Sequence, residues 1–271
     1  MDFQNIILDK RDRIATITLN RPERLNALSG ALMGELDVAL ADLENDRAIK
    51  VVIIKGAGRA FSVGYDVNPT SPERYGGMVD IGHDRRRLNN TVKRWLRLWD
   101  LSKPTIAQCH GYCVAGGTQL VSMCDLTIVS EDCQIGLPTA GPLGAGLMAA
   151  EWCHLVGVKK TKEMFYVIGK LIDGKEAARI GWANKAVPAD QLDAEVNKLA
   201  SEIADMPLEF LEIQKAAINH YVEMSGLREA MFYGADLDAV AHFTKPVQQF
   251  ISLIRERGIK QAKADWKKVI S

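Results

Sequence analysis

The stretch GYCVAGGTQLVSMCD, residues 111–125, joins two apolar segments through a turn rich in small residues. It follows an apolar run at 105–108 and precedes another at 126–129, so we expect a strand, a glycine turn, a helix to about residue 123 and a second strand. Gly116 and Gly117 stand where this helix begins. Glycine allows close backbone approach, and the first N–H groups of a helix are unpaired and partly positive. The turn is therefore a candidate anion site.

A second loop of the same kind, GAGRAFSVGYD (56–66), follows the apolar run 51–54. Because both loops leave buried strands, an N–H group from each could meet at one point and form an oxyanion hole. Each donor in such a hole typically contributes about 3 kcal/mol of transition-state stabilisation. The alternative is that the glycines only permit tight turns and close helix–strand packing. A nicotinamide-binding fingerprint is disfavoured, because Phe61 stands at the third glycine position.

Outward from these loops, the first two-thirds of the chain repeat a strand–turn–helix unit. Strands are expected around residues 6–8 and 15–19 with a turn at 9–12, and helices at about 32–43 and 84–101. From about residue 143 nearly everything is expected to be helical. One helix there carries an apolar stripe of Phe210, Ile213, Ala217 and Tyr221. The pattern predicts an α/β fold with a helical C-terminal region, divided into residues 1–200 and 201–271.

Composition narrows the possible partners. Among 271 residues, Lys plus Arg and Asp plus Glu both total 34, so no net charge favours nucleic acid or an anionic membrane. The five cysteines form no C-x-x-C pair, and we expect reduced thiols in a cytoplasmic protein without a signal peptide or membrane span. A zinc site on Cys109, His110 and Cys113 matches no common ligand spacing.

Four segments together resemble the crotonase superfamily, the enoyl-CoA hydratase/isomerase family. These are LNRPERLNAL (19–28), VVIIKGAGRAFSVGYDV (51–67), KPTIAQCHGYCVAGGTQLVSMCDLTIVSED (103–132) and ARIGWANKAVP (178–188). The resemblance implies a crotonase-like spiral of ββα turns, with the C-terminal region serving trimerisation in a homotrimer or a dimer of trimers. It also implies an acyl-CoA thioester substrate, with coenzyme A as part of the substrate and no separate cofactor or metal.

The resemblance also implies roles for individual residues. It assigns the two oxyanion N–H groups to Tyr65 and Gly117. It assigns contacts with coenzyme A to two segments of the chain, at Arg24, Leu25 and Ala27 and at Ala60, Ser62, Val63 and Asp66. Fixed amide dipoles suit a thioester enolate, because they need no reorganisation when its charge develops.

The chain departs from the family pattern at the two acid/base positions. A typical hydratase places one glutamate two residues after the glycine turn and another after a Gly-x-Pro in the next loop. Here these positions hold Gln119 and Thr139. An amide and a hydroxyl can hold a water molecule, but neither is a useful base at neutral pH. The glycines thus fit anion stabilisation, whereas Gln119 argues against ordinary hydration.

Three explanations for this departure stay open. A base could come from elsewhere in the chain, and the candidates are Asp66, Asp80, His83, Asp84, Glu151 and His154. The substrate could supply its own base, or the reaction could be isomerisation, C–C cleavage or decarboxylation. The chain could instead bind an acyl-CoA without catalysis. Trp95 and Trp99 could line an acyl pocket, although at helical spacing they fit a core equally well.

Overall fold

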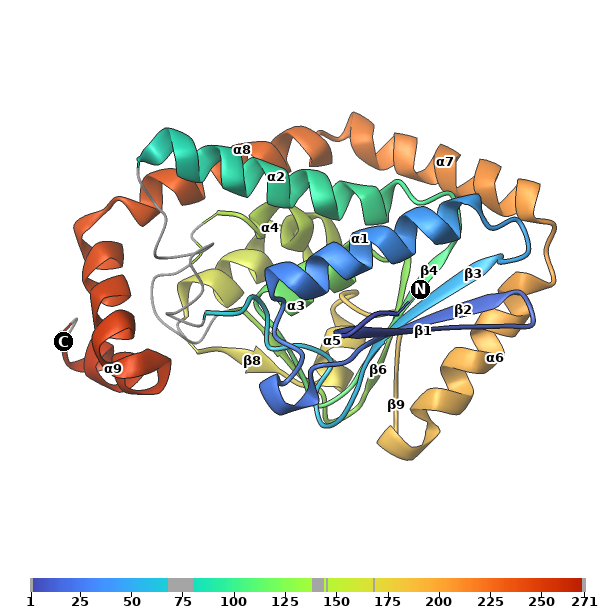
Figure 1. The fold of residues 1–271 in the computed structure, drawn as a ribbon, viewed down its shortest axis with the longest axis horizontal. Coiled ribbons are helices and arrows are strands. Elements are labelled where there is room, and N and C mark those ends of the chain that lie inside the picture. Colours follow the sequence, from blue (N-terminus) through green and yellow to red (C-terminus); the bar gives the residue numbers. More distant parts are fainter. Residues whose placement is uncertain (1, 68–79, 138–143, 145, 168, 270–271) are drawn as a thin grey trace.

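The computed structural model describes residues 2–67, 80–137, 144, 146–167 and 169–269 (Figure 1). Its main sheet has six strands in the order β1-β2-β3-β4-β6-β9. The strands are β1 (Ile6–Arg11), β2 (Ile14–Leu19), β3 (Val51–Gly56), β4 (Thr105–Cys109), β6 (Leu126–Ser130) and β9 (Lys185–Val187). All neighbours run parallel except β1 and β2, which pair antiparallel.

The β1–β2 hairpin corrects one prediction. Pairing continues to Arg11 opposite Ile14, so the turn is the dipeptide Asp12-Arg13 and not residues 9–12. Asp12 and Arg13 both have positive φ, 45° and 72°. Two left-handed residues match the twist of a two-residue hairpin. The prediction ended the strand too early because residues 9–11 are polar, yet they continue the pairing.

A smaller sheet lies beside the main one and carries the site. Its strands are β5 (Tyr112–Val114), β7 (Gln134–Gly136) and β8 (Leu171–Ile172), in that order. β5 runs parallel to β7, and β7 runs antiparallel to β8. β8 and β9 lie in the region expected to be nearly all helical, so that prediction missed two short strands of two and three residues. Such short strands carry too little alternation to be recognised from sequence.

Helices cover both faces of the main sheet. They are α1 (Gly30–Asn45), α2 (Ile81–Trp99), α3 (Gly116–Ser122), α4 (Ala149–Tyr166), α5 (Gly174–Arg179), α6 (Leu192–Ala204), α7 (Leu208–Met224), α8 (Leu227–His242) and α9 (Lys245–Val269), with 3-10 turns at Pro22–Arg24 and Ala189–Gln191. Val52 and Ile54 of β3 face a core formed largely with α1, α2 and α3, whereas Val51 and Ile53 face α6. Burial on both faces explains the continuous apolar run of β3.

The start of α2 corrects another boundary. The helix begins at Ile81, three residues before the predicted start, because the Asp80 side chain accepts a hydrogen bond from the His83 N–H at 2.7 Å. This is an N-cap contact, which fixes the first turn of a helix. Asp80 therefore has a structural role here.

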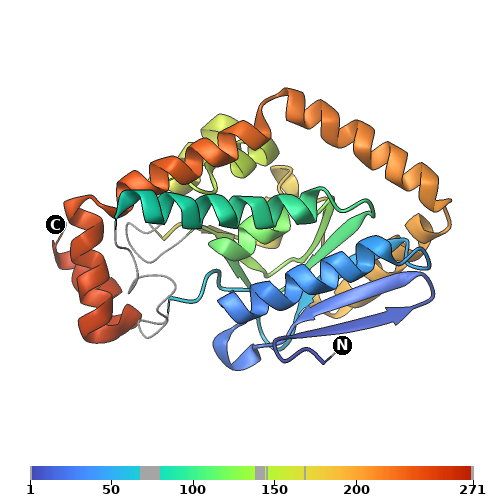
Figure 2. The same cartoon turned by 45° about the horizontal axis from the view of Figure 1, so that its top comes forward.

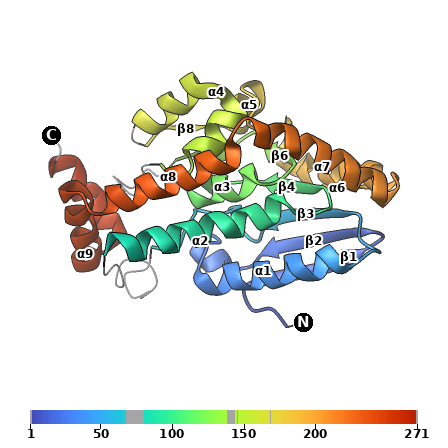
Figure 3. The same cartoon turned by 90° about the horizontal axis from the view of Figure 1, so that it is seen from above.

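The C-terminal helices form the other side of the molecule. α8 lies along α2, and α9 stands at the end of the molecule near the C-terminus (Figures 2 and 3). α7 confirms the predicted helix, but its apolar stripe faces outward, with Phe210 58%, Ile213 68% and Tyr221 73% exposed. Within the described ranges no helix is both long and apolar enough to cross a membrane. The division of the chain at residue 200 stays a prediction.

Candidate active site

The two glycine-containing loops lie side by side. The Ser62 N–H donates to the Tyr112 carbonyl and the Val114 N–H donates to the Ser62 carbonyl, both at 3.0 Å. These bonds join the segment after β3 to β5, directly before α3. The two candidate loops are thus brought together, as predicted from their positions after buried strands, because β3 and β4 are parallel neighbours in the sheet.

Close approach of the loops requires glycine. A Cβ at Gly64, whose φ is 86°, would lie 2.7 Å from the Gly116 nitrogen. A Cβ at Gly117 would lie 2.7 Å from the Ser62 carbonyl oxygen, and one at Gly116 would lie equally close to the Tyr65 ring. Such separations are below van der Waals contact. The tight-packing explanation for the glycines is therefore correct, and it is compatible with a ligand role for their amides.

The first residues of α3 carry the candidate donors. Ala115 precedes them with an unusual φ of 53°, and its carbonyl accepts from Thr118 and Gln119. Among the described residues, no hydrogen-bond acceptor serves the amides of Gly116 and Gly117. Both glycines are buried, so these two N–H groups are shielded from bulk water. Unpaired N–H groups at a helix start can receive an anion.

A line of side-chain hydrogen bonds crosses the site from α2 to α4. The Trp95 indole N–H donates to the Tyr65 hydroxyl at 2.8 Å, and that hydroxyl donates to Gln119 Oε1 at 2.6 Å. Gln119 Nε2 then donates to Glu151 Oε1 at 2.8 Å and to the Leu147 carbonyl at 3.2 Å. The indole of Trp95 can only donate and the Leu147 carbonyl can only accept, and together they set the direction of the bonds between them. Gln119 is fully buried, and both ends of its amide are engaged.

Glu151 is the ionisable member of this line. It lies in the first turn of α4 and is 1% exposed. Burial raises the pKa of Glu151 to about 7, which the hydrogen bond from Gln119 only partly offsets, and the nearby charge of Asp238 adds to the rise. Its Oε2 atom is buried and accepts no hydrogen bond in the described part of the chain. A carboxyl with this pKa exchanges protons near neutral pH.

The segments expected to contact coenzyme A meet at Asn26, which sequence reasoning missed. Asn26 is fully buried; its Nδ2 donates to the carbonyls of Ala57 and Ala60 at 2.8 and 2.7 Å, and its Oδ1 accepts from the Arg21 N–H. Leu25 and Asn26 both have left-handed backbones, with φ of 50° and 54°. This pair of left-handed residues is what places the Asn26 side chain against the second segment. Nothing in the letters RLNAL (24–28) indicated such a backbone, so the role of Asn26 was not predicted.

The predicted contacts with coenzyme A differ in how they lie. Arg24 is exposed, Leu25 and Val63 are half-buried, and Ala27 is buried. Ala60 and Ser62 are fully buried, and the Ser62 hydroxyl donates to the Asn26 carbonyl at 2.8 Å. Ala60 and Ser62 therefore shape the loop from within, and any ligand contact at these positions is through the main chain.

Comparison with known proteins gives this geometry its context. Residues 9–251 match the family model described as enoyl-CoA hydratase/isomerase. The chain belongs to the enoyl-CoA hydratase/isomerase family. A short-chain-enoyl-CoA hydratase of Clostridium acetobutylicum is 32% identical over 225 residues, which cover 81% of this chain and 82% of that protein.

Solved structures of the family confirm the predicted crotonase-like fold. An enoyl-CoA hydratase/isomerase from Xanthobacter autotrophicus Py2 superposes with a TM-score of 0.90 at 31% identity, covering 98% of both chains. An enoyl-CoA hydratase from Mycobacterium smegmatis gives 0.89 at 27% identity, covering 98% of this chain and 94% of that one. The fold and the family are thus settled by sequence and by structure together.

The other candidate bases are less suited to a catalytic role than Glu151. Two of the aspartates among them, Asp66 and Asp84, form ion pairs. Asp66 pairs with Arg21 at 3.0 Å. Asp84 is buried between Arg87 and His242, whose Nδ1 lies 2.6 Å from it. Burial alone would raise the pKa of Asp84, but the bond with His242 and the charge of Arg87 lower it below its ordinary value. His83 and His154 are exposed. Thr139 lies outside the described residues.

The tryptophans are part of the core. Trp95 is fully buried and Trp99 is 7% exposed. Trp95 still bears on the site through Tyr65, whose ring it also contacts with centroids 6.4 Å apart. The packing explanation for both tryptophans is therefore correct, with a hydrogen-bonding role added for Trp95.

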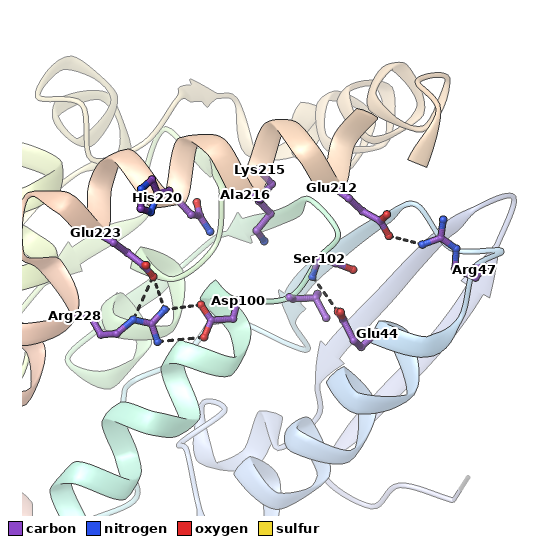
Figure 4. Close-up of a pocket in the computed structure, with 12 residues that line it drawn as sticks. Glu44, Arg47, Asp100, Ser102, Glu212, Lys215, Ala216, His220, Glu223 and Arg228 are labelled. Atoms are coloured by element: carbon purple, nitrogen blue, oxygen red, sulfur yellow. Dashed lines mark hydrogen bonds and ion pairs between the residues drawn. The ribbon is translucent and has the colours of Figure 1, made fainter. Parts of the chain in front are cut away.

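Cavities of different size lie beside the Tyr65 loop and beneath α7. One of about 230 Å³ lies beside the Tyr65 loop, between α1 and α2, and includes Arg87 and Arg94 in its wall. A larger one of about 650 Å³ lies between α7 and the C-terminal ends of α1 and α2 (Figure 4). Its charged groups pair with each other, as Arg228 does with Asp100 and Arg47 with Glu212. We read this larger cavity as a structural ion-pair network.

Proposed function

We propose that this chain acts on acyl-CoA thioesters and stabilises a thioester enolate with the main-chain N–H groups of Tyr65 and Gly117. The observation that carries the proposal is the contact between the two loops, which leaves no room for a Cβ at Gly64, Gly116 or Gly117. A hole built from the backbone is rigid, and rigidity is what makes such donors effective when negative charge develops on the substrate.

Coenzyme A would lie along the two segments joined by Asn26. Arg24 is exposed there and can meet a phosphate group, whereas Leu25, Ala27 and Val63 offer apolar contact. Asp66 is held by Arg21 at the end of the same loop and would keep the loop in position. These assignments use the acyl-CoA chemistry in the names of the related proteins together with the described geometry.

Hydration of a 2-enoyl-CoA is not the reaction that we favour. Gln119 donates both amide hydrogens, to Glu151 and Leu147, and its Oε1 accepts from Tyr65. Only one lone pair of Oε1 is left for a water molecule, and an amide oxygen is not a useful base. We favour double-bond isomerisation, C–C bond hydrolysis or decarboxylation, which use the same enolate. A non-catalytic acyl-CoA-binding protein is the alternative from another class, since amides at 119 and hydroxyls at 139 are poor bases.

We expect a homotrimer or a dimer of trimers in the cytoplasm. The outward apolar stripe of α7 supports association, because an exposed face of this kind is typical of protein contacts. Zero net charge is compatible with association and gives no attraction for nucleic acid or membranes.

Two measurements test the proposal. Thermal unfolding in the presence of acetyl-, butyryl-, crotonyl- and phenylacetyl-CoA should show a higher melting temperature with at least one ester, because a ligand that binds only the folded chain stabilises it. No shift with any ester would refute both the enzyme and the binding module. With crotonyl-CoA, loss of the enoyl absorbance should proceed no faster than in buffer. It should appear in the triple variant Gln119→Glu, Thr139→Glu, Glu151→Gln, which keeps one acid and one amide at the bonded positions 119 and 151.

A further inference from the structure

The side-chain line through the site ends on a carboxyl group that has one free oxygen. Oε1 of Glu151 accepts from Gln119 at 2.8 Å, whereas Oε2 is buried and, within the described ranges, has no partner. An unpaired buried oxygen is costly, so its presence calls for a cause. A proton on Oε2 would remove the buried charge, and a substrate group brought next to it would supply the missing hydrogen-bond partner.

The hydrogen bonds determine which oxygen carries the proton. The Leu147 carbonyl can only accept, so the NH₂ end of Gln119 is the end that faces it. Oε1 of Gln119 therefore accepts from the Tyr65 hydroxyl, which itself accepts from Trp95. This leaves the NH₂ end of Gln119 facing Glu151 Oε1, which is therefore an acceptor. The proton of a neutral Glu151 must sit on Oε2.

The location of Glu151 fits a role in the acyl site. It is one hydrogen bond away from Gln119, and Gln119 follows the glycine amides of α3 by two residues. Gln119 is also bonded to Tyr65, the other proposed oxyanion residue. The Gln119 side chain therefore links the carboxyl group to the first turn of α3 and to the side chain of Tyr65, whose main chain supplies the other proposed donor.

We propose that Glu151 is the catalytic residue that removes and returns the proton at the α-carbon of the acyl-CoA substrate, replacing the glutamates absent at 119 and 139. This inference rests on the proposed function. The α-carbon C–H bond breaks, its proton moves to Oε2, and its electron pair forms the enolate whose negative charge lies on the thioester oxygen. Return of the proton to carbon restores the carboxylate, so no other reactant is needed.

The surroundings of Glu151 poise it for this exchange. The titratable groups that face it in the described structure are Asp238 of α8, whose charge raises its pKa, and Tyr65 across Gln119. His154 lies one turn further along α4 and is exposed. Burial is the main cause that keeps the pKa of Glu151 near 7, so both protonation states are populated at neutral pH.

The test follows deuterium entry at the α-carbon in D₂O, by mass spectrometry, with each thioester that raises the melting temperature. The wild type should exchange, with a rate that rises as pH passes about 7 and levels off above it. Glu151→Gln should still bind the thioester and lose exchange by about 100-fold or more. Glu151→Asp, whose carboxyl is drawn back by one methylene, should be slower but keep the pH dependence.

Glu163→Gln is the matched control, because Glu163 lies at the other end of the same helix, half-buried and ion-paired with Lys160 and Lys170. Its exchange rate should equal that of the wild type. Exchange by Glu151→Gln at the wild-type rate, or no exchange by the wild type with any thioester that binds, would overturn the assignment while leaving the binding proposal intact. If no thioester binds, the proposed function fails and this inference fails with it.

Discussion

Replacing Glu151 by Gln should change how the stability of the fold depends on pH. Gln has the shape of the neutral acid and cannot ionise. The ordinary pKa of the side chain is 4.5, and in the folded chain it is about 7. The folded state therefore holds the proton to higher pH than the unfolded state does. The stabilisation from this group is complete below pH 4.5 and is lost as pH rises through 7.

The size of the effect follows from these two values. They differ by about 2.5, and each pKa unit corresponds to about 1.36 kcal/mol, so the full contribution is about 3 kcal/mol. Glu151 is 1% exposed, so solvent screening does not reduce this figure much. Between pH 5 and 8, the free energy of unfolding of the wild type should fall by about 2–3 kcal/mol relative to that of Glu151→Gln.

Urea unfolding at pH 5, 6, 7 and 8 measures this difference, with every variant at one protein concentration. In Glu163→Gln the curve should run parallel to that of the wild type, because the bonds from Lys170 and Lys160 lower the pKa of Glu163 and keep it ionised throughout this range. If the wild type and Glu151→Gln also run parallel over this range, the buried carboxyl does not hold its proton as described. The reasoning about its environment would then be refuted.

Three further substitutions test the packing of the site. Tyr65→Phe removes the hydroxyl shared by an indole and an amide and should lower the free energy of unfolding by about 2–4 kcal/mol in urea; an unchanged midpoint would contradict the hydrogen-bond line. Gly116→Ala places a methyl group 2.7 Å from the Tyr65 ring and should lower the free energy of unfolding by about 1–3 kcal/mol. The control Gly34→Ala has nothing within 4 Å of the added methyl group and should raise the free energy of unfolding by about 0.5–1 kcal/mol. Equal effects of the two substitutions in urea unfolding would argue against the close approach. Asn26→Ala breaks two hydrogen bonds between the two segments and one within residues 21–26, so it should cost at least about 2 kcal/mol and weaken thioester binding, measured by calorimetry. Binding at full affinity would remove Asn26 from the site's framework.

Much of the fold could be predicted from local patterns. The main strands were predicted from the apolar runs of β3, β4 and β6. The contact between the two loops was predicted from the glycine turn before α3 and the matching loop after β3. Strand ends were less predictable, because β1 continues through Lys10 and Arg11, which have no apolar pattern. The exposure of the apolar stripe on α7 could not be predicted either. Helical spacing of apolar residues shows that they share one face, but not whether another part of the chain covers that face.

The candidate site was only partly visible in the sequence. Gln119 stood out against the family pattern. Glu151 was one of six candidate bases, and it lies 32 positions after Gln119 in the chain. Only folding brings their side chains to 2.8 Å, which is why the pairing had no sequence signal. Asn26 gave no signal for the same kind of reason, because its importance depends on carbonyl groups more than 30 residues away.

The one-way order of the hydrogen bonds across the site makes positions 119 and 151 mutually dependent. A glutamate introduced at 119 would set two acids face to face across the 2.8 Å now spanned by an amide and a carboxylate. Such a pair shares a single proton at neutral pH, so the newcomer would not behave as an independent acid. Exchanging the two side chains, with Glu at 119 and Gln at 151, keeps one acid and one amide. A substitution that introduces a glutamate at 119, as in the typical hydratase, therefore has to be accompanied by a change at 151.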